Sequence, residues 1–171
     1  MTPAEKEDAF KWVQEHFLFI DTNGEEPSTL DSILERAKVA VKRMGVRGLI
    51  IDPYNYIELP RKDTTETEAI SNMLTRVQKF CKAFDVHTWF IAHPSKINRA
   101  GVEQPRPDGM SISGSMAWWA KTDCGLTVHR GDGCVEIAVW KCRYRWVGTQ
   151  GETTLLYNKT AGTYSENLDT F

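Results

Sequence analysis

Three short segments of this 171-residue chain combine an apolar run with a polar residue suited to phosphate chemistry. Residues 48–52 end in the carboxylate of Asp52, residues 89–93 end in His93, and residues 140–143 carry two cations. An aspartate that follows a buried strand can hold Mg²⁺ beside the phosphates of a nucleotide. A histidine at the end of a neighbouring strand can contact the terminal phosphate and report its loss to the following loop.

The third segment places cations at alternate positions, because Lys141, Arg143 and Arg145 alternate with aromatic residues or cysteine. Successive side chains of a strand point to opposite faces, so the pattern predicts three cations on one face. Such a row suits an arginine finger, which stabilises the charge that develops on a transferred phosphoryl group across a subunit interface. The alternative is an exposed edge strand that its charges protect against aggregation.

Residues 94–115 contain three prolines, three glycines and few apolar side chains, which predicts a long mobile loop. Lys96 and Arg99 lie near its start, and Arg106 follows. A loop with cations can bind DNA phosphates without reading the base sequence. The alternative is a solvated polar loop with no ligand.

The elements around these segments alternate between helix and strand. Capping patterns and apolar periodicity predict helices over residues 3–15, 28–44 and 65–84, and apolar runs predict strands over residues 17–20, 46–51 and 86–92. The near-continuous run at 46–51 is typical of a strand covered on both faces. The alternation predicts a parallel sheet whose carboxyl edge gathers Asp21, Asp52 and His93.

A short helix over residues 116–121 and strands over 124–129, 135–145 and 153–157 complete an α/β chain that we expect to form one globular unit. The formal net charge of -2 argues against wholesale coating of a nucleic acid. No segment approaches the roughly 18 apolar residues of a membrane span, and the N-terminus lacks a signal core. We therefore expect a soluble cytoplasmic protein without a membrane partner.

Taken in order, Leu-Ile-Ile-Asp at 49–52, Phe-Ile-Ala-His-Pro at 90–94, Ser-Ile-Ser-Gly-Ser at 111–115 and Trp-Lys-Cys-Arg at 140–143 resemble the RecA-like motor of hexameric replicative DNA helicases. The likeness is greatest to phage-type primase/helicases and the mitochondrial replicative helicase, and it extends from about residue 17 to residue 164. It implies a partial RecA-like fold, with a mainly parallel sheet flanked by helices and with antiparallel strands at the C-terminus.

The resemblance also implies roles for individual residues. Asp52 matches the Walker B acid, which binds Mg²⁺ together with the nucleotide, and His93 matches the phosphate sensor. Arg143 matches the arginine finger that acts in the neighbouring subunit's site, with Lys141 beside it. In the complete motor the resemblance implies Mg²⁺ and ATP, or another nucleoside triphosphate, as cofactors.

The loop between residues 96 and 113 matches the DNA-binding loop that lines the central channel in this family. Its candidate contacts to single-stranded DNA are Lys96, Arg99, Ser111 and Ser113. Hexameric rings and the unwinding of duplex DNA are further expectations from the resemblance.

The chain departs from the family because the phosphate-loop sequence G-x-x-x-x-G-K-[ST] occurs nowhere in it, and the catalytic glutamate has no counterpart. We therefore expect residues 1–171 to form a single truncated motor domain that begins after the phosphate loop. Such a chain should bind no nucleotide tightly and should hydrolyse ATP negligibly on its own. Loss of the phosphate-loop strand should expose a sheet edge, through which the chain could dimerise.

Two alternatives from other classes remain. Asp21, Asp52 and His93 could ligate a metal ion in a phosphoesterase. The chain could also be a non-catalytic module that docks on DNA or on an intact helicase ring. Metal titration separates the first alternative from the helicase interpretation, and an assembly assay separates the second.

Overall fold

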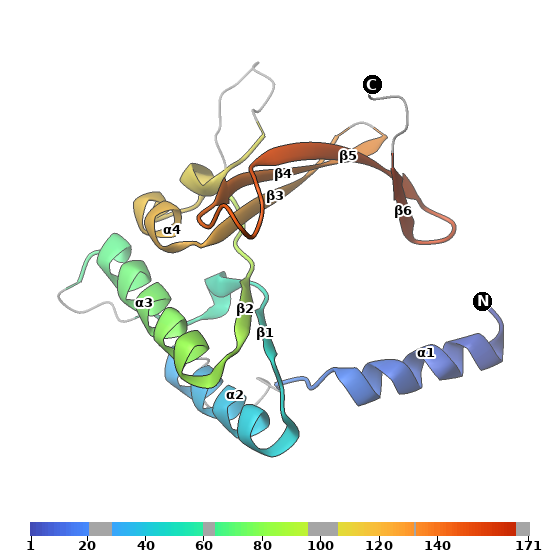
Figure 1. Cartoon of the computed structure of the whole chain (residues 1–171), viewed down its shortest axis with the longest axis horizontal. Coiled ribbons are helices and arrows are strands. Elements are labelled where there is room, and N and C mark those ends of the chain that lie inside the picture. Colours follow the sequence, from blue (N-terminus) through green and yellow to red (C-terminus); the bar gives the residue numbers. More distant parts are fainter. Residues whose placement is uncertain (21–28, 60–63, 96–105, 132, 167–171) are drawn as a thin grey trace. The chain divides into compact units, whose positions relative to one another are not determined.

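A computed structural model of the chain describes residues 1–20, 29–59, 64–95, 106–131 and 133–166 (Figure 1). The chain forms two compact units. The first comprises Met1–Leu59 and Val77–Ile91, and the second comprises Pro60–Arg76 and Ala92–Phe171. The long helix α3 (Glu66–Phe84) therefore contributes its first half to the second unit and its second half to the first.

Helices and a parallel strand pair build the first unit. Its elements are α1 (Pro3–His16), α2 (Leu30–Met44), β1 (Gly48–Ile51), the short 3₁₀ helix η1 (Tyr54–Tyr56), the second half of α3, and β2 (His87–Phe90). All three predicted helices and two of the three predicted strands are present, with ends that differ by a few residues.

The helix ends follow from local hydrogen bonds. In the capping box of α1, the Thr2 amide donates to Glu5 Oε2 at 2.6 Å and the Glu5 amide donates to Thr2 Oγ1 at 3.3 Å. The same exchange precedes α3, where the Thr65 amide donates to Glu68 Oε2 at 3.0 Å. Helix α2 ends at Gly45, whose φ of 71° lies in the left-handed region that favours glycine. These boundaries confirm the capping patterns in the sequence.

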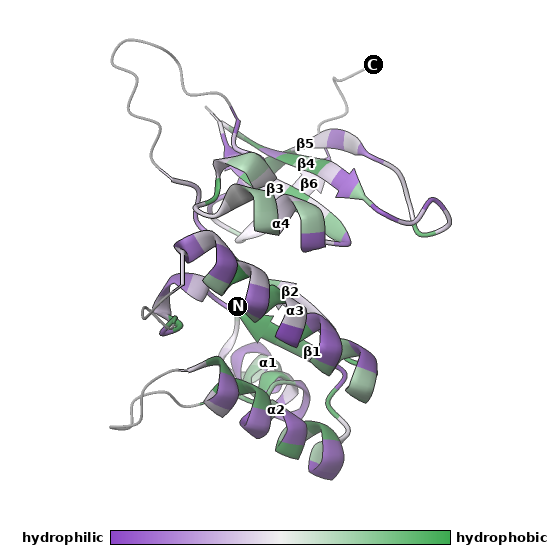
Figure 2. Cartoon of the chain, turned by 90° about the vertical axis from the view of Figure 1, so that its left-hand side faces the viewer, coloured by the Kyte–Doolittle hydropathy of each residue, from purple (hydrophilic) through white to green (hydrophobic). Residues whose placement is uncertain are grey.

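Strands β1 and β2 pair in parallel, with Ile51 opposite Phe90. The expectation that residues 46–51 form a strand covered on both faces is wrong for the described part of the chain. Leu49 and Ile51 are 7% and 6% exposed, whereas Ile50 and its register partner Trp89 are 55% and 53% exposed. The physical reason is that α2 and the second half of α3 lie on one face of the pair only (Figures 1 and 2).

The predicted strand over residues 17–20 is absent from the structure. These residues follow α1 as extended chain without a pairing partner among the described strands. Phe17, Leu18 and Phe19 are 45%, 52% and 77% exposed. An apolar run forms a strand only where a neighbouring strand accepts its hydrogen bonds, and the described part of this unit offers none.

An antiparallel sheet dominates the second unit. Its elements are the first half of α3, the 3₁₀ helix η2 (Gly109–Ser111), α4 (Ser115–Lys121), β3 (Cys124–Arg130), β4 (Cys134–Cys142), β5 (Gly151–Asn158) and β6 (Thr163–Glu166). The four strands lie in the order β3-β4-β5-β6. Together with the parallel pair, this sheet confirms the predicted α/β class with antiparallel strands at the C-terminus.

Gly114 positions α4 against the first half of α3. Its φ is 68°, and a Cβ added there would lie 2.5 Å from Cδ1 of Ile70, which is fully buried. Both the backbone conformation and the close approach therefore require glycine. Trp118 on α4 is 3% exposed, so it is a packing residue of the second unit.

Candidate functional site

Asp52 follows directly after β1, at the carboxyl edge of the parallel pair. The Ile91 amide donates to the Ile51 carbonyl at 2.9 Å, so the pairing continues to the last residue of β1. The Asp52 side chain is exposed and makes no hydrogen bond or ion pair within the described residues. Ligands of open α/β sheets bind at this edge, and the carboxylate is available to one.

His93 follows β2 by three residues and is also exposed. Just beyond it, the Ser95 amide donates to the Ser111 carbonyl at 2.7 Å and anchors the segment to η2. His93 belongs to the second unit and Asp52 to the first. A joint site of these two residues stays a prediction.

The first unit has a hollow with a volume of about 260 Å³ where α2 and α3 end. Its lining residues are Val41, Gly45, Val46, Arg47, Phe84 and Asp85. Residues 45–47 precede β1 and residues 84–85 precede β2, so the hollow lies at the amino edge of the strands. It is therefore distinct from the carboxyl edge that Asp52 follows.

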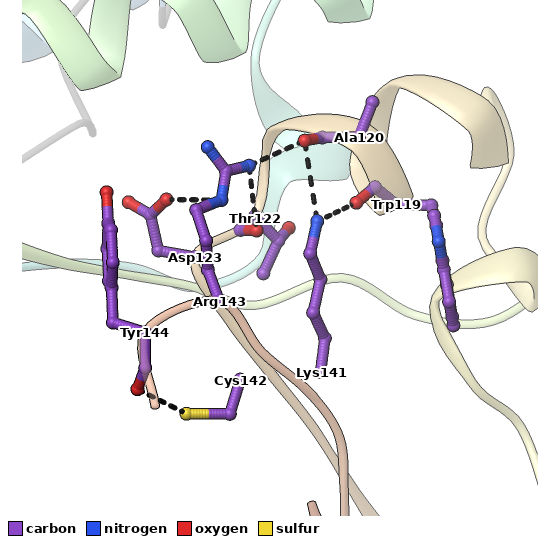
Figure 3. Close-up of polar contacts among 8 residues, drawn as sticks. All are labelled: Trp119, Ala120, Thr122, Asp123, Lys141, Cys142, Arg143 and Tyr144. Atoms are coloured by element: carbon purple, nitrogen blue, oxygen red, sulfur yellow. Dashed lines mark hydrogen bonds and ion pairs between the residues drawn. The ribbon is translucent and has the colours of Figure 1, made fainter. Parts of the chain in front are cut away.

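The two predicted trans-acting cations, Lys141 and Arg143, bind the C-terminal end of α4 (Figure 3). Lys141 Nζ donates to the carbonyls of Trp119 and, at 3.4 Å, of Ala120. Arg143 Nη2 donates to the Ala120 carbonyl at 2.7 Å and to the Thr122 carbonyl at 3.3 Å. These carbonyls lack helical partners and carry the negative end of the helix dipole, so both cations cap α4.

Asp123 holds the guanidinium from the other side. Arg143 Nε lies 3.1 Å from Asp123 Oδ1, and the Arg143 amide donates to the Asp123 carbonyl at 2.8 Å. Partial burial lowers the pKa of Lys141, and the neighbouring Arg143 lowers it further, while Asp123 acts in the opposite direction. The sequence interpretation missed Asp123, although an acid directly after a short helix and opposite a cationic strand end was a usable signal.

The prediction of three cations on one strand face is wrong. Strand β4 ends at Cys142, so Arg143 lies just beyond the strand. Arg145 lies in a turn over residues 144–147, closed by a hydrogen bond of 3.0 Å from the Val147 amide to the Tyr144 carbonyl. The alternation of residue types continues past the end of the strand, whereas the pleat that would align the side chains does not.

An irregular pairing at Trp140 sets where the two cations lie. The β3–β4 register shifts between Gly125 and Leu126, which leaves Trp140 as the extra residue of a bulge. Its indole ring stacks on Trp119 with ring centroids 5.1 Å apart and packs so closely on Gly109 and Gly125 that neither position has room for a Cβ. Glycine within a strand was the sequence signal for this close approach.

No protein-family model matches the chain. The chain is similar to a curated protein, the Twinkle homolog protein, chloroplastic/mitochondrial, of Arabidopsis thaliana. It is 37% identical over 175 residues, which cover 98% of this chain and 24% of that protein.

The chain is also similar in fold to solved structures. One of them, an ATPase domain, has a TM-score of 0.66 and 18% identity, covering 82% of this chain and 52% of that one. A DnaB-like replicative helicase, from a structure that treats its interactions with primase, has a TM-score of 0.64 and 18% identity, covering 80% and 35%. The chain has the RecA-like fold of helicase ATPase domains and is similar to a region of the Twinkle homolog. The resemblance read from the sequence is thereby confirmed, and the chain spans about a quarter of the Arabidopsis relative.

Only part of the predicted DNA loop is described. Lys96 and Arg99 lie outside the described residues. Ser111 ends the capped turn η2, and Ser113 Oγ donates to Glu66 Oε1 at 2.7 Å. Both serines therefore contact the second unit's own elements, and their contact with DNA stays a prediction.

Arg106, the third cation of that loop, is engaged by the antiparallel sheet. Its Nη1 lies 2.7 Å from Glu152 Oε2 and 3.9 Å from Glu136 Oε2. The pair of carboxylates fixes the C-terminal part of the loop to β4 and β5.

The donor set at Asp52 limits how this chain could hold Mg²⁺. Among the described residues, no group of three or more His, Cys, Asp or Glu side chains is arranged to bind a metal ion, and Asp21 lies outside them. A single carboxylate suffices for Mg²⁺ only where phosphate oxygens and water complete its shell. Asp52 therefore fits a metal that arrives with a nucleotide.

The described helices do not reach the length and apolar content that crossing a membrane would require. The location of this chain in the cytoplasm stays a prediction, and the Arabidopsis relative is named as a chloroplastic or mitochondrial protein.

Proposed function

We propose that this chain is the C-terminal part of an ATP-dependent replicative DNA helicase motor. The observation that carries the proposal is the 37% identity to the Twinkle homolog along 98% of the chain. The exposed acid after β1 and the two cations at the end of β4 support it, because they lie at strand ends, where a motor of this kind holds its nucleotide-binding groups.

In this proposal, Asp52 is the Walker B acid and His93 senses the terminal phosphate. Bound Mg²⁺ would neutralise charge on the phosphates of the nucleotide. Asp52 would orient the ion through a water or a direct bond, and its lack of a competing partner within the described residues supports that role.

Arg143 and Lys141 would act in the site of a neighbouring subunit. The bonds from Nε to Asp123 and from Nη2 to the α4 carbonyls fix the plane of the guanidinium. Nη1 makes none of the contacts found within the described residues, so it can face the neighbour's nucleotide while the other nitrogens hold their partners. A cation positioned in advance stabilises the developing charge without reorganisation.

Residues 96–113 would contact single-stranded DNA in the channel of a hexameric ring. On its own, the chain should hydrolyse no ATP, since its 171 residues contain no phosphate-loop sequence to cradle the β- and γ-phosphates. Activity would therefore require a phosphate loop from outside these 171 residues.

A subunit-mixing experiment tests the proposal. The chain is mixed with the complete Arabidopsis relative whose own finger arginine has been replaced, and DNA-stimulated ATP hydrolysis is measured. We expect the chain to raise the rate at least about tenfold, in line with the size of arginine-finger effects. The increase should be lost with Arg143→Ala.

Arg145→Ala provides the matched control, because Arg145 lies two residues away in the exposed turn. It should retain the increase. A rate that no variant of the chain changes, together with no co-assembly on a sizing column, would refute the motor proposal. An increase that survives Arg143→Ala would refute only the finger role.

A further inference from the structure

Two of the four cysteines lie directly opposite each other at one end of the antiparallel sheet. Cys124 is the first residue of β3, Cys142 is the last residue of β4, and the two are register partners. Cys124 is exposed, Cys142 is partly buried, and both are free thiols in this structure. Opposite residues of an antiparallel pair present their side chains on the same face of the sheet. The two thiols therefore share one face at one end of the sheet.

The backbone hydrogen bonds beside this pair show how closely the two strands approach there. The Arg143 amide donates to the Asp123 carbonyl at 2.8 Å, one residue outside the two cysteines. Hydrogen-bonded and non-hydrogen-bonded pairs alternate along an antiparallel ladder, so Cys124 and Cys142 form a non-hydrogen-bonded pair, whose Cα atoms are roughly 4.5 Å apart. A disulfide requires Cα atoms about 4.4–6.8 Å apart. The two cysteines therefore meet the backbone requirement for a cross-strand disulfide.

The other two cysteines are placed differently. Cys134 lies opposite Leu156 of β5. Cys81 belongs to α3, and its Sγ lies 3.0 Å from Thr88 Oγ1. Within the strand pairings that the structure describes, no second pair of cysteines is in register. Substitution of these two residues therefore leaves the opposed pair intact.

A change of side-chain rotamer is the movement that would join the two sulfur atoms. The Cys142 thiol donates to the Tyr144 carbonyl, with Sγ 3.5 Å from the oxygen (Figure 3). A thiol is a weak donor, so this bond opposes rotation about the Cα–Cβ bond only slightly. The Val147 amide donates to the same carbonyl at 3.0 Å, which keeps the turn closed when the thiol leaves.

We propose that Cys124 and Cys142 form a reversible cross-strand disulfide by exchange with a small-molecule disulfide such as oxidised glutathione. The thiolate of the exposed Cys124 attacks one sulfur of the small disulfide, and the first small thiol leaves. The thiolate of Cys142 then attacks the Cys124 sulfur, which forms the protein disulfide and expels the second small thiol. Two protein thiols are oxidised, the small disulfide is reduced to two thiols, and these take up the two protons.

The disulfide would link the strand ends that carry the two cations and their acidic partner. Cys142 lies between Lys141 and Arg143, and Cys124 directly follows Asp123. Strand ends open locally in most proteins, and a covalent bond at this position prevents β3 and β4 from separating there. Oxidation would therefore hold Arg143 and Asp123 together more persistently. The inference concerns the chain's own thiols and stands without the proposed function.

Thiol mapping of the full chain tests the pairing. The chain is incubated with oxidised glutathione, the remaining thiols are alkylated, and the peptides are identified by mass spectrometry. We expect a link between Cys124 and Cys142 that dithiothreitol reverses. Cys142→Ser should instead retain glutathione on Cys124, because no second thiol is present to expel it. The double variant Cys81→Ser with Cys134→Ser is the matched control and should form the same link as the wild type.

Amide hydrogen exchange measures the effect on the strand ends. Oxidation should slow exchange of the Arg143 amide at least about tenfold, since a disulfide restricts the open states of the segment that it closes. The same treatment of Cys124→Ser should leave that rate unchanged. A wild-type chain that yields only mixed disulfides, links between molecules, or a link through Cys81 or Cys134 would overturn the proposal. Because the mapping is done on the wild-type chain, misfolding of a serine variant would not affect this result.

Discussion

The acid after β1 and the two cations at the end of β4 both lie at strand ends, but their surroundings differ. Asp52 is exposed and makes no polar contact within the described residues. Lys141 and Arg143 donate to three carbonyls at the end of α4, and Arg143 also pairs with Asp123. The chain thus fixes its cations in place and leaves its acid free for a ligand.

This difference fits the two proposed roles, in which the acid binds a metal ion in its own subunit and the cations act in the site of a neighbouring subunit. A metal ligand must exchange water and phosphate oxygens during each cycle, so an unpaired carboxylate suits it. A cation that acts across an interface gains from being held in one orientation before the neighbour arrives. The same contacts also stabilise α4, so substitutions in the two regions should differ in their effect on folding.

The largest expected effect comes from crowding the bulge that supports the cations. Gly125→Ala places a methyl group inside the van der Waals radius of the Trp140 indole, and overpacking of this kind costs about 1–3 kcal/mol of unfolding free energy. Denaturant unfolding measures the loss. Gly48→Ala in β1 is the control, because a Cβ there has no neighbour within 4 Å, and it should change stability by less than about 0.5 kcal/mol. If the two variants lost equal unfolding free energy, the bulge would tolerate an added methyl group as well as β1 does, and the two regions would not differ in packing.

Removing the guanidinium should have the next largest effect. Arg143→Ala deletes two bonds to α4 carbonyls and the ion pair with Asp123. Because the Arg143 side chain is 38% exposed, solvent screens these contacts, and we expect a loss of about 1 kcal/mol together with faster amide exchange in α4. Asp52→Ala should be neutral to within about 0.5 kcal/mol. If Asp52→Ala destabilised the chain as much, the carboxylate would have a structural partner after all.

Local patterns predicted the helices well because their signals lie within the helices themselves. The Thr2 and Glu5 capping box, its counterpart at Thr65 and Glu68, and Gly45 all mark ends that the structure confirms. The strand over residues 17–20 failed because a strand depends on a partner far away in sequence. The burial of Ile50 failed for the same reason, since periodicity does not reveal whether a second layer covers a sheet.

The same distinction between local and long-range signals applies to the candidate site. Asp52 could be placed at a strand end from sequence because only the end of β1 mattered. The third cation of the predicted row was misplaced because a bulge at Trp140 and the end of β4 at Cys142 depend on pairing with β3 and on Gly109. The order of the motifs along the chain was sufficient to recognise the resemblance to a RecA-like motor. Tertiary contacts, in contrast, decide which groups each cation contacts.

The pKa of Lys141 offers a smaller test of how tightly the cations are held. Burial and Arg143 lower the folded-state pKa below the ordinary lysine value of about 10.4, so the unfolded chain binds the proton more strongly. Below the folded-state pKa, this difference lowers the free energy of unfolding by its full amount. The loss disappears as pH rises to the ordinary lysine pKa. Wild type should therefore gain stability relative to Lys141→Gln between neutral pH and about pH 10.4. The gain should shrink in an Arg143→Ala background, and an unchanged gain would exclude Arg143 as a cause.

The smallest effect should come from the capping box of α3, which sets a baseline for an exposed charged contact with no proposed role in the motor. The Thr65 amide, followed by its hydroxyl, lowers the pKa of Glu68 by hydrogen bonding to the carboxylate. This contribution is present above the ordinary carboxyl value of about 4.3 and is lost as pH falls through the folded-state pKa. Glu68→Gln should therefore flatten the acid side of the stability profile slightly, as measured by circular dichroism from neutral to strongly acidic pH. If Glu68→Gln cost as much as Arg143→Ala, the contacts around Arg143 would be ordinary helix capping, and their strength would no longer support a cation held ready for a neighbouring subunit.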